Sequence, residues 1–184
     1  MTKQTERKAI DKVFILLGSA ATVVLLAVGG LAWYGYTFAT GMVTDQLSAQ
    51  RIFFPAKDSE SFAALSSEDQ AAIEPFAGQQ LTTGEQAKVY ANNYIGAHLH
   101  HMADGKTYAE ISQAAQKEPD DKKLAGLKAA LFQGETLRGM LLGSGYAFWT
   151  FGMIALYAAI ASFVGAIFMA LLVLLGLRHL AKIK

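Results

Sequence analysis

The sequence contains no cysteine among its 184 residues. Disulfide bridges, zinc fingers and thiolate nucleophiles are therefore excluded, because each of them needs a cysteine sulfur. A domain of this chain in an oxidising compartment must be held together by packing alone. The net charge is only +1, so the composition indicates neither a nucleic-acid-binding protein nor an acidic interaction tail.

The common catalytic motifs are also missing. The chain has no GxSxG, P-loop, HExxH or GxGxxG pattern. The acidic pairs Glu68-Asp69 and Asp120-Asp121 are adjacent in sequence, so on a helix their side chains point about 100° apart. That geometry is typical of solvated faces or helix caps rather than of an acid–base couple. We therefore expect no enzymatic activity and no cofactor.

Charge is missing from two long stretches, Val13–Thr44 and Gly139–Leu177. A helix of about 20 residues is enough to cross a bilayer. The first stretch predicts a transmembrane helix over residues 13–40. It is longer than the apolar core of 7–15 residues in a cleaved signal peptide, so we interpret it as a signal anchor. The second predicts a helix over residues 139–177 that contains a second span. Aromatic residues favour the membrane–water interface, and those at the facing ends of the two stretches are predicted anchors: Trp33, Tyr34, Tyr36, Tyr146 and Trp149.

The flanking charges predict the orientation. Residues 1–12 carry four Lys or Arg, and the tail 178–184 carries three. The segment between the spans, residues 41–138, contains nine basic and thirteen acidic residues. Because basic flanks stay in the cytoplasm, we expect a plasma-membrane protein with both termini cytoplasmic and an extracytoplasmic domain between the spans.

This middle segment reads as helical. Thr82–Glu85 and Thr107–Glu110 match capping boxes and predict helices to about Ala103 and Lys117. A shorter helix is expected over Ser67–Ile73, ahead of Pro75. The apolar run Ile52–Phe54 is expected to enter the core.

A last outer helix, capped by Asp120 or Asp121, carries Leu124, Leu127 and Leu131 at three/four spacing. It can continue into the second span, with a kink at one of its glycines. The predicted fold class is all-α, with two transmembrane helices flanking an extracytoplasmic helical domain.

Histidine is concentrated at one place, His98-Leu-His100-His101. On a helix His98 and His101 share a face, whereas His100 points away. Two imidazoles are too few for a catalytic zinc site, which needs a further ligand. Three interpretations stay open: packing and hydrogen bonding beside Tyr94, a metal site at His98 and His101, or a pH-sensitive contact.

Small residues recur every three or four positions along the second span. Such a stripe lets helix backbones approach closely in lipid, where packing drives association. The predicted helix-packing and assembly face comprises Gly152, Ala155, Ala158, Ala159, Ser162, Ala166 and Ala170. Its partner can be the first span, a second copy or another protein.

Short stretches resemble a set of small actinobacterial membrane proteins of unknown function with two spans. The similar residues are Val43–Leu47 with Arg51-Ile52, Gly105–Glu110, Leu131-Phe132 with Thr136–Gly139, and the span 148–177. Some of those proteins are labelled "aromatic ring-opening dioxygenase". A non-haem iron site needs two histidines and a carboxylate in a preformed pocket, and the residues here do not support that label.

These features lead us to expect a non-enzymatic membrane protein whose partners are the lipid bilayer and either other membrane subunits or copies of itself. Its expected role is that of an accessory or structural subunit of an envelope or respiratory complex, or of a homo-oligomer. One alternative is an extracytoplasmic sensory or binding module that relies on a partner for output. Another is an envelope protein that handles metal through His98 and His101.

Overall fold

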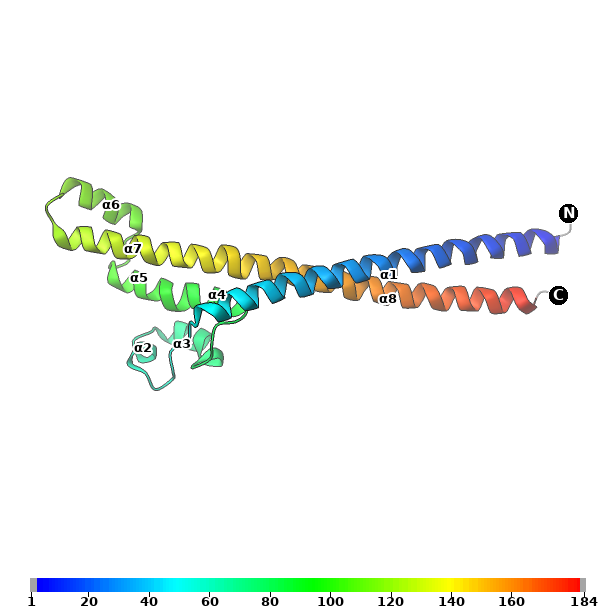
Figure 1. Cartoon of the computed structure of the whole chain (residues 1–184), viewed down its shortest axis with the longest axis horizontal. Helices are drawn as coiled ribbons and strands as arrows, with labels where there is room; N and C mark the ends of the chain where they lie inside the picture. Colours follow the sequence, from blue (N-terminus) through cyan, green and yellow to red (C-terminus); the bar gives the residue numbers. More distant parts are fainter. Residues whose placement is uncertain (1–2, 183–184) are drawn as a thin grey trace. The chain divides into compact units, whose positions relative to one another are not determined.

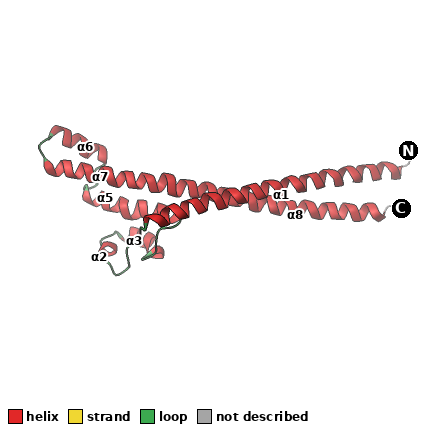
Figure 2. Cartoon of the chain, viewed as in Figure 1, coloured by secondary structure: helices red, strands yellow, loops and turns green. Residues whose placement is uncertain are grey.

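The computed structural model describes residues 3–182, which are mostly helical (Figure 2). Beyond them lie residues 1–2 of the expected cytoplasmic flank and residues 183–184 of the expected tail. The elements in chain order are α1 (Lys3–Gln50), α2 (Glu60–Ala63), α3 (Ser67–Ile73), the 3₁₀ turn η1 (Glu74–Phe76), α4 (Gly84–Val89), the π-helical η2 (Tyr90–Gly96), α5 (Ala97–Met102), α6 (Tyr108–Lys117), α7 (Lys122–Met140), the π-helical η3 (Leu141–Ala147) and α8 (Phe148–Lys182).

The expected all-α class is confirmed. Within residues 3–182 the backbone forms no β-strand, and an isolated antiparallel bridge joins Phe53 to Gln80. The chain divides into two compact units. We call them the helix pair, which is the described part of residues 1–38 and 152–184, and the helical domain, Ala39–Phe151.

Two helical runs are long and apolar enough to cross a membrane, Glu6–Gln50 and Lys122–Lys182. Only 11% of the most apolar window of each is buried inside the protein. The core helix of a soluble protein would hide such a stretch, because exposed apolar surface in water is costly. The run Lys122–Lys182 joins α7, η3 and α8, as expected from the spacing of the leucines.

In the helix pair, α1 and α8 lie side by side and antiparallel (Figure 1). Small residues of one helix face large residues of the other. A Cβ added to Gly18 would lie 2.8 Å from Val173 Cγ2, and one added to Gly29 would lie 2.9 Å from the ring of Phe163. The glycines therefore provide the space into which larger side chains pack.

The buried side of α8 follows a seven-residue spacing, Gly152, Ala159 and Ala166. In α1, Gly18, Leu25, Gly29 and Ala32 are buried or half-buried at spacings of seven, four and three. A repeat of 3.5 residues per turn is the spacing of a left-handed coiled coil, in which the same side of each helix keeps facing the other.

The helical domain contains two apolar clusters. The larger cluster combines side chains from α1, α3, α4, η2, η3 and the loops that follow α1 and precede α4: Val43, Leu47, Phe54, Ile73, Leu81, Ala87, Ala91 and Leu141. The smaller one joins α5, α6 and α7 through Leu99, Ala103, Ile111 and Leu131.

The expected entry of Ile52–Phe54 into the core is confirmed for Phe54, which is buried, whereas Phe53 is 55% exposed. The chain here is extended, and successive side chains of an extended chain point to opposite sides.

The predicted capping boxes are present at the N-termini of α4 and α6, with one correction. Thr107 and Glu110 form the expected box: Thr107 N–H donates to Glu110 Oε2 at 2.7 Å, and Glu110 N–H donates to Thr107 Oγ1 at 3.3 Å. These bonds lower the pKa of the Glu110 carboxyl. The predicted box Thr82–Glu85 is wrong by one residue.

Thr83 caps α4, and Gln86 takes the reciprocal position, with its Oε1 accepting from Thr83 N–H at 3.1 Å. Gln86 is buried and Glu85 is exposed. A neutral amide can occupy this buried position at a lower desolvation cost than a carboxylate.

Candidate functional site

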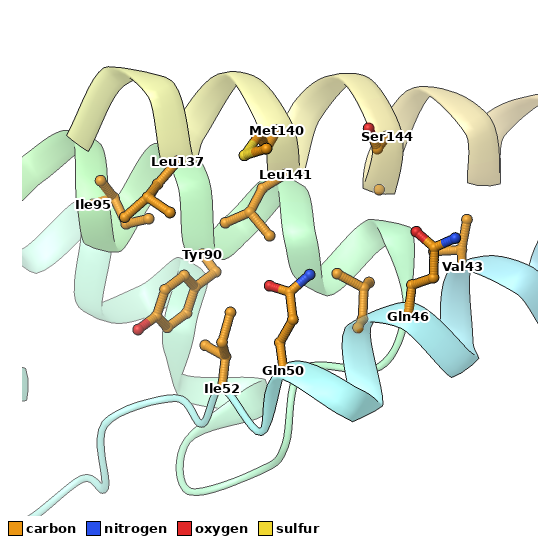
Figure 3. A pocket seen from close by; sticks show the side chains of 12 residues that line it. Val43, Gln46, Gln50, Ile52, Tyr90, Ile95, Leu137, Met140, Leu141 and Ser144 are labelled. Carbon is orange, nitrogen blue, oxygen red and sulfur yellow. The ribbon is translucent and has the colours of Figure 1, made fainter. Parts of the chain in front are cut away.

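A pocket of about 370 Å³ lies inside the helical domain, between the end of α1, η2 and the α7–η3 segment (Figure 3). We call it the apolar pocket. Its wall receives Val43 and Leu47 from α1 and Ile52 from the loop that follows α1. The opposite side contributes Ile95, Leu137, Met140 and Leu141.

The polar groups of the apolar pocket carry no charge. They are the amides of Gln46 and Gln50 on α1, the Ser144 hydroxyl on η3 and the phenol of Tyr90. Within residues 3–182 neither amide nor the Ser144 hydroxyl has a hydrogen-bond partner. Figure 3 shows the Gln50 side chain reaching toward Leu141, while Gln46 lies beside Val43 at the end nearer Ser144.

Two sides of the apolar pocket include π-helical turns, η2 and η3. Such turns are uncommon and occur frequently at functional sites. In η3 the buried Gly145 leaves room for close packing against α4, because a Cβ there would lie 3.1 Å from Ala87 Cβ. The expected kink near the glycines is therefore a π turn, and the helix continues through it.

Tyr90 forms one end of the apolar pocket (Figure 3). Its ring lies edge-on to Phe54, with 5.2 Å between centroids, and 4.9 Å from the ring of Tyr94. Burial raises the pKa of the Tyr90 hydroxyl, and the neighbouring Tyr94 raises it further. The phenol is therefore neutral at physiological pH.

Arg138 on α7 binds η2 through Nε and Nη2 of its guanidinium, while Nη1 pairs with Glu135 on the same helix. Nε donates to the carbonyl oxygen of Ala91 at 3.0 Å, Nη2 donates to Asn92 Oδ1 at 3.3 Å, and Nη1 contacts both carboxylate oxygens of Glu135 at 2.9 and 3.0 Å. The sequence patterns described above do not predict this role of Arg138. The three-residue spacing of Glu135 and Arg138 was the available signal.

A second, polar cleft of about 580 Å³ lies between η2, α5 and the start of α6. It includes Arg138, His100 and Lys106 as well as Asp69 and Glu135. Because charges of both signs line it and Arg138 is already paired, the cleft selects no ligand class.

The three histidines of α5, His98, His100 and His101, are all exposed. Across residues 3–182 no three His, Cys, Asp or Glu side chains come together as metal ligands. The geometry thus gives no support to a metal site at His98 and His101.

The residues of the small-residue stripe differ in burial. Gly152, Ala159 and Ala166 are buried inside the helix pair, and Ala155, Ser162 and Ala170 are half-buried. Ala158 is exposed. Most of the stripe therefore packs within this chain, and Ala158 is its one predicted member that is fully open to another molecule.

The aromatic residues predicted as interface anchors also differ in exposure. Trp33 and Tyr34 are exposed and Tyr36 is half-buried. Tyr146 and Trp149 are half-buried in the helical domain, where Lys88 Nζ lies 4.9 Å from the Tyr146 ring centroid and Trp149 packs over Gly84.

These features define the chain as an all-α protein with two candidate membrane-spanning helices and a helical domain that holds an uncharged pocket. Comparisons with protein-family models, curated proteins and solved structures find no match.

Proposed function

We propose that the chain is a non-enzymatic plasma-membrane protein that serves as an accessory or structural subunit of a larger membrane assembly. In this proposal both termini are cytoplasmic and the helical domain is extracytoplasmic. The basic flanks and the acidic middle segment support the orientation. The partner is either another membrane protein or a second copy of this chain.

The orientation can be tested in intact cells, because the native sequence has no cysteine to interfere. We expect cysteines introduced at the exposed positions Asp58 and Gln116 to react with a membrane-impermeant maleimide. A cysteine at exposed Ala181 should react only after the cells are opened. Labelling of Ala181→Cys alone in intact cells would show the inverted orientation.

An exposed apolar face on α7 is the observation that carries the accessory role. Phe132, Leu137 and Met140 are 59%, 54% and 64% exposed, and their helical positions fall within an arc of about 140°. Between them lie the uncharged residues Gln133 and Thr136. Large apolar side chains grouped on one exposed face indicate an interaction surface.

This face is also expected to lie outside the lipid. Phe132 precedes the expected interface residue Trp149 by 17 positions, which corresponds to roughly 25 Å along a helix. Lipid therefore does not account for its exposure, and a protein partner does.

We expect Phe132→Glu to release the partner, because a carboxylate in an apolar interface loses its hydration without gaining a counter-charge. The measurement is purification in a mild detergent, followed by native mass spectrometry to distinguish a second copy from a different protein. Gln116→Glu, at an exposed position on α6 outside this face, adds the same charge and is the control. Retention of the same partner by Phe132→Glu and wild type would contradict the proposal.

The apolar pocket favours a second candidate function, the binding module. In that case the helical domain recognises a small molecule and the partner transmits the response. Its size falls within the range of about 300–1,000 Å³ that is usual for ligand sites, although at the small end.

A further inference from the structure

We propose that the apolar pocket binds an uncharged amphiphile whose head carries adjacent hydroxyls or ring carbonyls and whose body is a single apolar chain or ring. This inference names a ligand class for the helical domain. It uses the membrane placement of the proposed function only to identify where the ligand comes from.

The absence of charge from the lining selects against ions. No Asp, Glu, Lys, Arg or His lines the apolar pocket. Arg138 follows Leu137 in sequence, but its guanidinium is bound to Ala91, Asn92 and Glu135. A carboxylate or phosphate in the apolar pocket would lose its hydration without gaining a partner, which is strongly unfavourable.

The polar groups define the head of the ligand. Gln46 and Gln50 are four residues apart on α1, so their Cβ atoms are about 5–6 Å apart on one face. Ser144 is on the opposite side, on η3. An amide offers both a donor and an acceptor, and a hydroxyl can serve as either. Adjacent hydroxyls, or carbonyls on a ring, match this set, and these three side chains have no competing partner within residues 3–182.

The volume defines the body of the ligand. A pocket of about 370 Å³ is at the small end of the range that is usual for ligand sites. One short chain or one ring is the apolar body that a pocket of this size encloses. Leu47 and Leu141, both buried, provide the apolar contact surface.

The lipid bilayer is the natural source of such a molecule. Val43, the first lining residue, follows Tyr36, the last aromatic anchor expected on the first span, by seven positions in the same helix. A monoacylglycerol and a quinone are membrane-soluble molecules with the required chemistry, and both can be used as probes.

The test uses the full chain in phosphatidylcholine nanodiscs with a monododecanoylglycerol that carries a photoreactive diazirine on its chain. We expect cross-links on peptides that contain Val43–Ile52 or Leu137–Gly145. Unlabelled monododecanoylglycerol should compete at least tenfold better than dodecanoate, which has the same chain and a charged head. Competition by decylubiquinone as well, at lower concentration, would identify a quinone as the better ligand of the same class.

Two variants connect the cross-link to the apolar pocket. Gln46→Leu combined with Gln50→Leu removes the amides at similar volume, and we expect it to reduce cross-linking at least fivefold. Ser144→Phe fills the opening and should abolish it. All three positions are exposed, so the variants should fold, which circular dichroism can verify. Gln133→Leu makes the same kind of change outside the apolar pocket and should have no effect.

Three results would overturn the proposal: cross-links confined to the membrane-spanning segments, full cross-linking in both pocket variants, or equal competition by dodecanoate. Leu137 and Met140 belong both to the apolar pocket and to the exposed face of α7, so the two proposals are separated by variants at residues that belong to only one of them. Phe132→Glu should leave the cross-link unchanged, and the double glutamine variant should retain the partner.

Discussion

Replacing Gly84 with alanine is expected to destabilise the helical domain more than the same replacement at any other glycine of the domain. A Cβ on Gly84 would collide with the Cβ and Cγ atoms of Trp149 and would lie 2.9 Å from the carbonyl oxygen of Gly145. A flexible side-chain end could move away, but a Cβ and a backbone carbonyl cannot move without separating α4 from η3. Overpacking of this kind costs about 3 kcal/mol at the upper end of the usual range.

The measurement is thermal unfolding in mild detergent. For a domain of this size a loss of about 3 kcal/mol corresponds to a fall in Tm of roughly 10 °C or more. The chain has two tryptophans, Trp33 and Trp149, so a Trp33→Phe background makes the fluorescence report on Trp149 alone. We expect its emission to shift to longer wavelength when Gly84→Ala forces the indole away from α4.

Gly139→Ala is the matched control, because a Cβ at Gly139 on α7 meets no atom within 4 Å. Alanine favours a helix interior by up to about 1 kcal/mol over glycine, so this variant should be as stable as wild type or slightly more stable. Similar Tm values for Gly84→Ala and Gly139→Ala would show that α4 does not pack tightly on η3.

The features that were predictable from sequence are those set by neighbours along the chain. The Thr107–Glu110 box is recognisable because the two reciprocal bonds lie within three residues. Helix Ser67–Ile73 was predicted with its observed bounds. The error at Thr82–Glu85 has the same origin, since both Thr82–Glu85 and Thr83–Gln86 fit the pattern locally. Burial of Gln86, a tertiary property, decides between them.

The apolar pocket could not be predicted in this way. Its residues come from three segments that are far apart in sequence, and two of its sides include π turns whose residues, Tyr90–Gly96 and Leu141–Ala147, carry no marker in their spacing. Arg138 illustrates the same limit, because its acceptor on Ala91 is a backbone carbonyl 47 residues away.

The small-residue stripe of the second span shows what spacing alone leaves open. Ala158 and Ala159 are adjacent and chemically identical, and both belong to the predicted packing face. In the structure Ala159 is fully buried within the helix pair, whereas Ala158 is exposed. The sequence predicts a close helix contact, and the structure shows that the contact on the Ala159 side is made within the chain.

Ala159→Leu is therefore expected to separate the helix pair, and Ala158→Leu to leave it intact. Along α8, Ala159 lies between two close approaches, Gly35 to Ala155 and Gly29 to Phe163. There is no room between them for an isobutyl group, so α1 and α8 must move apart. The expected cost is about 1–3 kcal/mol, and in lipid no bulk hydrophobic force offsets lost packing.

An engineered disulfide can measure this separation directly. A Cβ on Gly35 would lie 3.8 Å from Ala155 Cβ, which is within the 3.5–4.5 Å that a disulfide requires. The chain contains no other cysteine, so Gly35→Cys with Ala155→Cys should cross-link on mild oxidation. We expect Ala159→Leu to slow this cross-linking about tenfold, in line with the packing cost, and Ala158→Leu to have no effect on it. Loss of a partner from Ala158→Leu, with the disulfide still forming, would assign the exposed side of the stripe to assembly. Equal cross-linking rates in the two leucine variants would mean that Ala159 does not face α1, and the seam of the helix pair would have to be placed elsewhere on α8.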